Sequence, residues 1–131
     1  MKLERVSSAC PAPAELDRGE LIDLARWLYE SRRSRDRILG ASLLGEPVWD
    51  MMLALYCLPP RGEPLCISSL CYAAAAPQTT ALRWVQLLEQ KGLIERSPDP
   101  GDARRTFVSL TEEGETMMTA VLRSHHAQRP R

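Results

Sequence analysis

One segment of the chain combines a helical period with side chains that can contact nucleic acid. In a helix over residues 77–91, at about 100° per residue, Ala81, Val85 and Leu88 fall on a single apolar stripe. The opposite side and the first turn are polar, and the candidate contact residues there are Gln78, Thr79, Arg83 and Gln86. Arginine, glutamine and threonine side chains can meet base edges and phosphates. The pattern predicts a recognition helix that enters the major groove of double-stranded DNA.

Charge supports this interpretation, although any surface helix has a polar outer face. No acidic residue occurs between Pro77 and Leu88 in a chain that balances 17 Lys and Arg against 17 Asp and Glu. Arg104 and Arg105 follow in a segment near a predicted loop tip, from which arginine can reach the DNA backbone or the minor groove. The alternative partners of these arginines are Asp99 and Asp102. We expect Asp102 to stabilise the loop by pairing with Arg104, and either arginine could contact DNA.

The elements that must position these residues can be placed from turn and cap signals. We expect a short strand over residues 65–67, a helix from an N-cap at Ser68 to Ala75, and the helix 77–91 ending at Gly92. Strands over residues 93–96 and 106–110 then flank a turn at residues 97–102. Thr111 is expected to cap a final helix that fades by about Ala127. This order predicts a mainly α fold with a small β-hairpin, a winged helix-turn-helix.

The N-terminal half provides support. Residues 1–13 are expected to form a flexible arm, and a helix from Glu15 carries an apolar stripe that includes Leu21 and Leu28. Trp27 and Tyr29 widen this apolar surface, which favours a subunit contact. A nearly all-apolar helix from Pro47 to Leu58 is expected to be buried. The basic run at residues 32–37 is typical of a solvated helix face.

The chain therefore divides into an arm, one domain and a tail. The single winged-helix domain is expected over residues 14–127, with its helix-turn-helix at about 66–92 and its wing at about 93–110. Residues 128–131 are expected to be a tail.

Residues 65–115 resemble the MarR family of transcriptional regulators. Residues 99–114, DPGDARRTFVSLTEEG, match the family's wing pattern DPxDxRxxxVxLTxxG, and residues 77–94 are similar to its recognition helix and following strand. The resemblance implies a dimeric regulator that binds pseudo-palindromic DNA and is often released by small phenolic ligands or by oxidation. A homodimer is expected, and since neither a secretory signal nor a membrane-spanning run is visible, the expected location is cytoplasmic. It also implies that Asp102 and Arg104 form a wing-stabilising and DNA-contacting pair. The family has two helices after the wing, whereas the residues after Leu110 here are enough for one helix and a short tail.

Other function classes have weaker support. Cys57, Cys66 and Cys71 could serve a metal sensor of the ArsR type, but their spacing is unlike a CxxC pair. Cys10 could serve a redox-responsive regulator. The zero net charge favours a winged-helix protein-interaction module that does not bind DNA. The sequence shows neither a nucleophile–base motif nor a phosphate-binding glycine loop, so an enzyme is not expected. No cofactor, metal or membrane segment is expected either.

Overall fold

The computed structural model describes residues 16–39, 46–59 and 63–128. The arm expected at residues 1–13 and the end of the expected tail lie outside the described residues. The elements follow in the order α2 (Arg18–Leu39), α4 (Pro47–Cys57), β1 (Leu65–Cys66), α5 (Ile67–Ala73), α6 (Gln78–Gln90), β2 (Ile94–Asp99), β3 (Asp102–Leu110) and α7 (Glu112–Gln128). The winged helix-turn-helix predicted from the order of elements is therefore confirmed.

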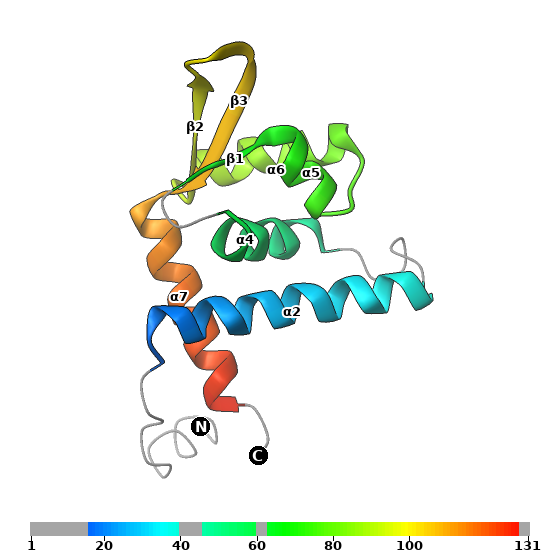
Figure 1. Ribbon diagram of the computed structural model, residues 1–131, viewed down its shortest axis with the longest axis vertical. Coiled ribbons are helices and arrows are strands. Elements are labelled where there is room, and N and C mark those ends of the chain that lie inside the picture. The colour runs from blue at the N-terminus through cyan, green and yellow to red at the C-terminus, as the bar shows by residue number, and fades with distance from the viewer. Residues whose placement is uncertain (1–15, 40–45, 60–62, 129–131) are drawn as a thin grey trace.

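The helices are stacked in layers around α4 (Figure 1). α2 lies on one side of α4, and α5 and α6 lie on the other, while α7 descends from the sheet across the first half of α2. Every residue of α4 from Asp50 to Cys57 is buried, as its apolar sequence predicted, and Pro47 occupies its first turn. No helix in the described part of the chain is long and apolar enough to cross a membrane.

The sheet is antiparallel with strand order β1-β3-β2. β1 pairs Leu65 with Val108 and Cys66 with Phe107. The hairpin strands are longer than the sequence predicted, because Ser97 and Pro98 pair with β3 and the turn shrinks to Pro100 and Gly101. Pro98 is tolerated because β2 is an edge strand, where a missing N–H costs little. The Asp99 carboxylate tightens the turn by accepting a 2.8 Å hydrogen bond from the Gly101 N–H.

The predicted helix ends need one correction. Ser68 was expected to cap α5, but Cys66 is the N-cap residue and α5 begins at Ile67. The reason is the pairing of Cys66 with Phe107, which carries the strand directly into the helix and leaves Ser68 inside the first turn. Gly92 ends α6 as expected, with a φ of 76° that suits glycine.

A buried charge cluster joins α2 to α4. The carboxylate of Asp50, whose side chain is 1% exposed, accepts hydrogen bonds from Arg32 and Arg33, and the Arg33 Nη2–Asp50 Oδ2 distance is 2.8 Å. Arg33 Nη1 also donates to the Ala73 carbonyl at 2.8 Å, and the Tyr29 hydroxyl donates to the same carbonyl at 2.6 Å. The expectation that the basic run is a solvated face is therefore wrong for Arg32 and Arg33. Their place on α2 brings them over the first turn of α4 and the end of α5.

Replacing Asp50 with asparagine is expected to destabilise the fold strongly. The substitution keeps the size of the side chain but leaves two arginines without their counter-charge in a buried position, which costs about 3–5 kcal/mol. Urea unfolding of the wild type and of Asp50→Asn measures this loss.

Asp23→Asn is the matched control. Asp23 also neighbours an arginine, Arg26 at 3.7 Å, but its side chain is 80% exposed. Its loss should change the free energy of unfolding by less than about 0.5 kcal/mol. Equal effects of the two substitutions would contradict the role assigned to Asp50.

The wing is fastened to α7 at Thr111 and Gly114. The Thr111 hydroxyl donates to the Gly92 carbonyl at 2.6 Å and accepts the Gly114 N–H at 3.0 Å, which confirms Thr111 as the cap of the final helix. The Thr111 N–H donates to the Leu93 carbonyl at 3.0 Å. A Cβ atom added at Gly114 would lie 2.1 Å from the Leu93 oxygen. Glycine is needed here for this close backbone approach.

Gly114→Ala is accordingly expected to lower the free energy of unfolding. Displacing backbone in a packed region costs about 1–3 kcal/mol, which exceeds the gain of about 1 kcal/mol that alanine brings to a helix. Gly19→Ala is the control, since its nearest neighbour for a new Cβ is a side-chain oxygen at 3.4 Å. Thermal and urea unfolding should show a loss at position 114 and none at position 19.

Candidate nucleic-acid interface

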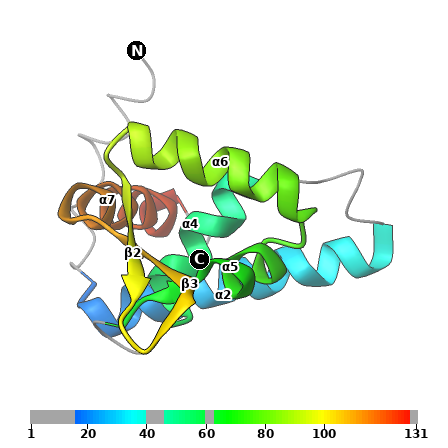
Figure 2. The same cartoon turned by 90° about the horizontal axis from the view of Figure 1, so that it is seen from above.

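The outer face of α6 is uncovered. Ala81, Val85 and Leu88 are buried, as the apolar stripe predicted. The four candidate contact residues Gln78, Thr79, Arg83 and Gln86 are all exposed. In the view from above, α6 runs along the outer edge of the molecule beside the hairpin (Figure 2). The structure therefore places the predicted polar face where a duplex has access to it.

The charge of this face is set by what surrounds it. The first turn of α6 has no acidic residue. Glu89, near the other end of α6, is paired with Arg96 of β2 at 2.7 Å. Trp84 is partly buried and packs against the core. The exposed face from Gln78 to Gln86 consequently has Arg83 as its charged residue.

The wing separates its two arginines. Asp102 Oδ1 accepts hydrogen bonds from the Arg104 backbone N–H at 3.0 Å and from Arg104 Nε at 3.2 Å. These bonds, the backbone one first, lower the pKa of Asp102. The Arg104 side chain is 91% exposed. Arg105 lies instead beside Asp99, with Nε 3.8 Å from Asp99 Oδ2. The two acidic residues thus hold one arginine each.

A recess at the root of the wing brings candidate contact residues together with two residues, Cys66 and Ser68, that the sequence did not connect with DNA. This wing-root pocket has a volume of about 210 Å³ and is lined by Cys66, Ile67, Ser68, Gln78, Arg104, Arg105 and Thr106. The sequence predicts Cys66 as a strand residue and possible metal-sensor ligand, and Ser68 as a helix cap. The signal that could have found them is the pairing of β1 with β3, which sets Cys66 opposite Phe107, two residues from Arg105.

The thiol of Cys66 is unusually acidic. Its Sγ lies 3.4 Å from the Ser68 hydroxyl and 3.1 Å from the Ser69 hydroxyl. Hydrogen bonds from these two serines, with a smaller contribution from Arg105, lower the pKa of Cys66 to about 6. Burial instead raises the pKa of Cys57 to about 11 and also raises the pKa of Cys71. Cys66 is therefore the thiolate among the three at neutral pH.

The metal-sensor alternative gains no support from this arrangement. Within residues 16–39, 46–59 and 63–128, no three His, Cys, Asp or Glu side chains are grouped to hold a metal ion. Cys57 and Cys71 are buried. Cys10, the candidate for a redox response, lies outside the described residues.

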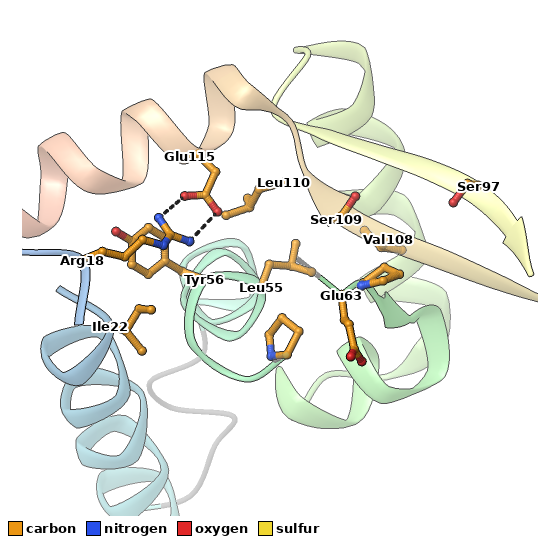
Figure 3. Close-up of a pocket in the computed structure, with 12 residues that line it drawn as sticks. Arg18, Ile22, Leu55, Tyr56, Glu63, Ser97, Val108, Ser109, Leu110 and Glu115 are labelled. Atoms are coloured by element: carbon orange, nitrogen blue, oxygen red, sulfur yellow. Dashed lines mark hydrogen bonds and ion pairs between the residues drawn. The ribbon is translucent and has the colours of Figure 1, made fainter. Parts of the chain in front are cut away.

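A second cavity lies where the wing meets the supporting helices (Figure 3). It has a volume of about 270 Å³, and its walls come from α2, α4, β3 and α7. Arg18 crosses it and donates to both oxygens of Glu115, at 2.7 and 3.2 Å. The guanidinium also lies 5.1 Å from the centre of the Tyr56 ring. The hydrogen bond to Glu115 is the main reason that the pKa of Arg18 is raised.

Cys66 is expected to react with iodoacetamide faster than Cys57 and Cys71 at pH 7. The thiolate is the nucleophile, and the lowered pKa of Cys66 keeps it in that form above about pH 6. Mass spectrometry of the Cys10→Ser protein after timed labelling measures the three rates. Lowering the pH to about 5 should slow the reaction of Cys66. Equal rates for the three thiols in the folded protein would contradict the assignment.

Part of the chain is similar to known DNA-binding proteins. Residues 50–114 match the family model of the winged helix DNA-binding domain. The transcriptional regulator HosA of Escherichia coli O111:H- is 39% identical over 54 residues, which cover 41% of this chain and 40% of HosA. The HTH-type transcriptional repressor NicR of Pseudomonas putida is 38% identical over 55 residues, covering 42% of this chain and 35% of NicR. The chain thus spans two fifths or less of the length of these curated relatives.

A solved structure supports the same fold. The complex of S. aureus MepR with DNA matches with a TM-score of 0.56 and 22% sequence identity, covering 79% of this chain and 83% of MepR. At this level of identity the likeness establishes the fold. It agrees with the winged-helix architecture that the sequence predicted.

Proposed function

We propose that the chain is a MarR-type transcriptional regulator that binds double-stranded DNA, because residues 50–114 match the winged helix DNA-binding domain. The observation that carries the proposal is the exposed, acid-free face of α6 beside the arginines of the wing. Named relatives that include this domain are transcriptional regulators, and we propose no catalytic activity. The proposed location is the cytoplasm.

The proposed docking places the start of α6 deepest in the major groove. In helix-turn-helix proteins the second helix contacts base edges through its N-terminal residues. Gln78, Thr79, Arg83 and Gln86 are the side chains that would meet bases or phosphates there. The hairpin lies beside α6 at the same end of the molecule, so its arginines would follow the backbone or enter the adjacent minor groove (Figures 1 and 2).

The zero net charge does not oppose this function. Binding to DNA depends on phosphate contacts made by a local surface. The acidic residues that neutralise the chain include Asp50 in the core, Glu115 beside Arg18, and Glu89, which lies near the end of α6 and is paired with Arg96. Local segregation of charge therefore favours DNA over a protein-interaction module.

A second copy of the chain is the proposed partner in DNA binding. Two half-sites one helical turn apart need two recognition helices. Large apolar side chains are exposed on two helices outside the helix-turn-helix, including Trp27 and Ile38 of α2 and Met117 and Val121 of α7. α2 and α7 contact each other, and we propose that these side chains contribute to a homodimer interface.

The cavity beside Arg18 is the proposed place for a small-molecule effector. Its walls include residues of α2, α7 and β3, so a molecule bound there would contact both the supporting helices and the sheet. An effector that displaced Glu115 from Arg18 would loosen the attachment of α7 to α2.

Arg83→Ala is expected to weaken specific DNA binding by about 1–3 kcal/mol if Arg83 reads a base. The measurement is fluorescence anisotropy with a duplex selected from a random pool, a selection that also reveals the half-site spacing. Equal loss for specific and random duplexes would make Arg83 a phosphate contact.

Arg123→Ala is the control for Arg83→Ala. It removes the same charge from an exposed site in the second half of α7, a helix that runs away from the wing (Figure 1), and should leave the affinity unchanged. Affinity of the wild type should also fall steeply with salt, because phosphate contacts release counterions. An unselective pool, or no binding at low salt, would overturn the proposed function.

A further inference from the structure

The wing-root pocket joins three parts of the candidate interface. Its walls come from the junction of β1 and α5, from the first residue of α6 and from β3 of the wing. Gln78, Arg104 and Arg105 had been assigned to DNA from their places in the sequence, whereas Cys66 and Ser68 had not. The pocket is therefore the point at which the recognition helix and the wing share one polar hollow.

The side chains around this hollow favour an anion. Arg105 supplies a guanidinium, Gln78 an amide, and Ser68 and Thr106 supply hydroxyl groups. These are the groups that contact phosphate oxygens in protein–DNA complexes. Among the residues that line the pocket there is no aspartate or glutamate, and the acidic group present is the Cys66 thiol, whose thiolate form Arg105 helps to stabilise.

Arg105 is better suited than Arg104 to hold an anion in the pocket. Arg104 forms a hydrogen-bonded ion pair with Asp102, and its side chain is 91% exposed. Arg105 is 52% exposed, lies 5.7 Å from the centre of the Phe107 ring and stands 3.8 Å from Asp99, too far for a hydrogen bond. Its guanidinium is thus held near the pocket by weak contacts and retains donors for a ligand.

We infer that the wing-root pocket receives one backbone phosphate of the bound duplex, with Arg105 as the paired cation and Cys66 beside the bound phosphate. The inference rests on the proposed function and adds to it that the two neighbouring arginines contact different parts of the DNA. Arg105 fixes the wing on the backbone, and Arg104 is left for the minor groove. Cys66 and Ser68 become part of the DNA contact surface.

The rate at which Cys66 is alkylated reports whether the pocket is occupied. A phosphate in the pocket covers the thiol, so bound DNA slows its alkylation. A carboxamidomethyl group on Sγ occupies the space of the phosphate, so alkylation weakens DNA binding. Cys66→Ser keeps a small polar side chain and removes the reactive thiol, so this variant shows whether an effect of alkylation on DNA binding comes from Cys66.

The first experiment tests which backbone phosphate, if any, Arg105 contacts. Duplexes that carry one neutral methylphosphonate at successive positions of a half-site are titrated with the wild type, Arg105→Gln and Arg104→Gln. At one position the neutral group weakens wild-type binding by about tenfold, the value of a charged hydrogen bond. Arg105→Gln loses this sensitivity, and its salt dependence falls by about one phosphate contact.

Arg104→Gln is the matched control, because it removes the adjacent arginine of the same strand. It retains the sensitivity to the neutral phosphate at that position. Thermal melting checks that each variant is folded. If Arg105→Gln stays sensitive at every position where the wild type is sensitive, the inference is overturned.

The second experiment follows the thiol in the Cys10→Ser protein. Saturating selected duplex should slow alkylation of Cys66 at least fivefold and leave the slow reactions of Cys57 and Cys71 unchanged. Prior alkylation should weaken DNA binding, and in a Cys10→Ser/Cys66→Ser protein iodoacetamide should have no effect on binding. An unchanged rate for Cys66 in a saturated complex would overturn the inference.

Different results would overturn the phosphate pocket and the proposed function. Selective DNA binding by the wild type without protection of Cys66 overturns the phosphate pocket and leaves the proposed regulator intact. Absence of binding to any duplex overturns the proposed function and the pocket with it.

Discussion

The contact on which the molecule depends is the buried carboxylate of Asp50. It neutralises Arg32 and Arg33 where α2 crosses α4, and Arg33 continues to the carbonyl of Ala73 at the end of α5. Tyr29 donates to the same carbonyl. A buried carboxylate is tolerated only when it is paired, and here the pairing orients three helices at once. The position of the helix-turn-helix relative to α2 follows from this cluster.

A second constraint is the short strand β1. Its two residues pair with β3, so the strand before the helix-turn-helix and the wing after it are fixed to each other. Thr111 and Gly114 then fasten the base of the wing to the end of α6 and the start of α7. The recognition helix and the wing arginines therefore form one surface with a defined geometry.

Chain neutrality and a DNA-binding surface are compatible in this fold. Asp50 is buried in the core, Glu89 is paired with Arg96, and Asp99 lies beside Arg105 of the wing. The surroundings of Cys66 likewise explain its lowered pKa, because hydroxyl groups of Ser68 and Ser69 and the guanidinium of Arg105 lie near the thiol. Charge at the interface is thus a property of the fold, whereas net charge is a property of the composition.

What the sequence determined by itself is what depends on near neighbours along the chain. The apolar stripe of Ala81, Val85 and Leu88 predicted the face that α6 exposes, because residues three and four apart share one side of a helix. Tertiary structure decided the burial of Arg32 and Arg33 and the extent of the hairpin. It also decided the pocket that brings Cys66 to Arg105. Those outcomes depend on contacts between residues far apart in the chain, and helical or strand periodicity carries no information about such pairs.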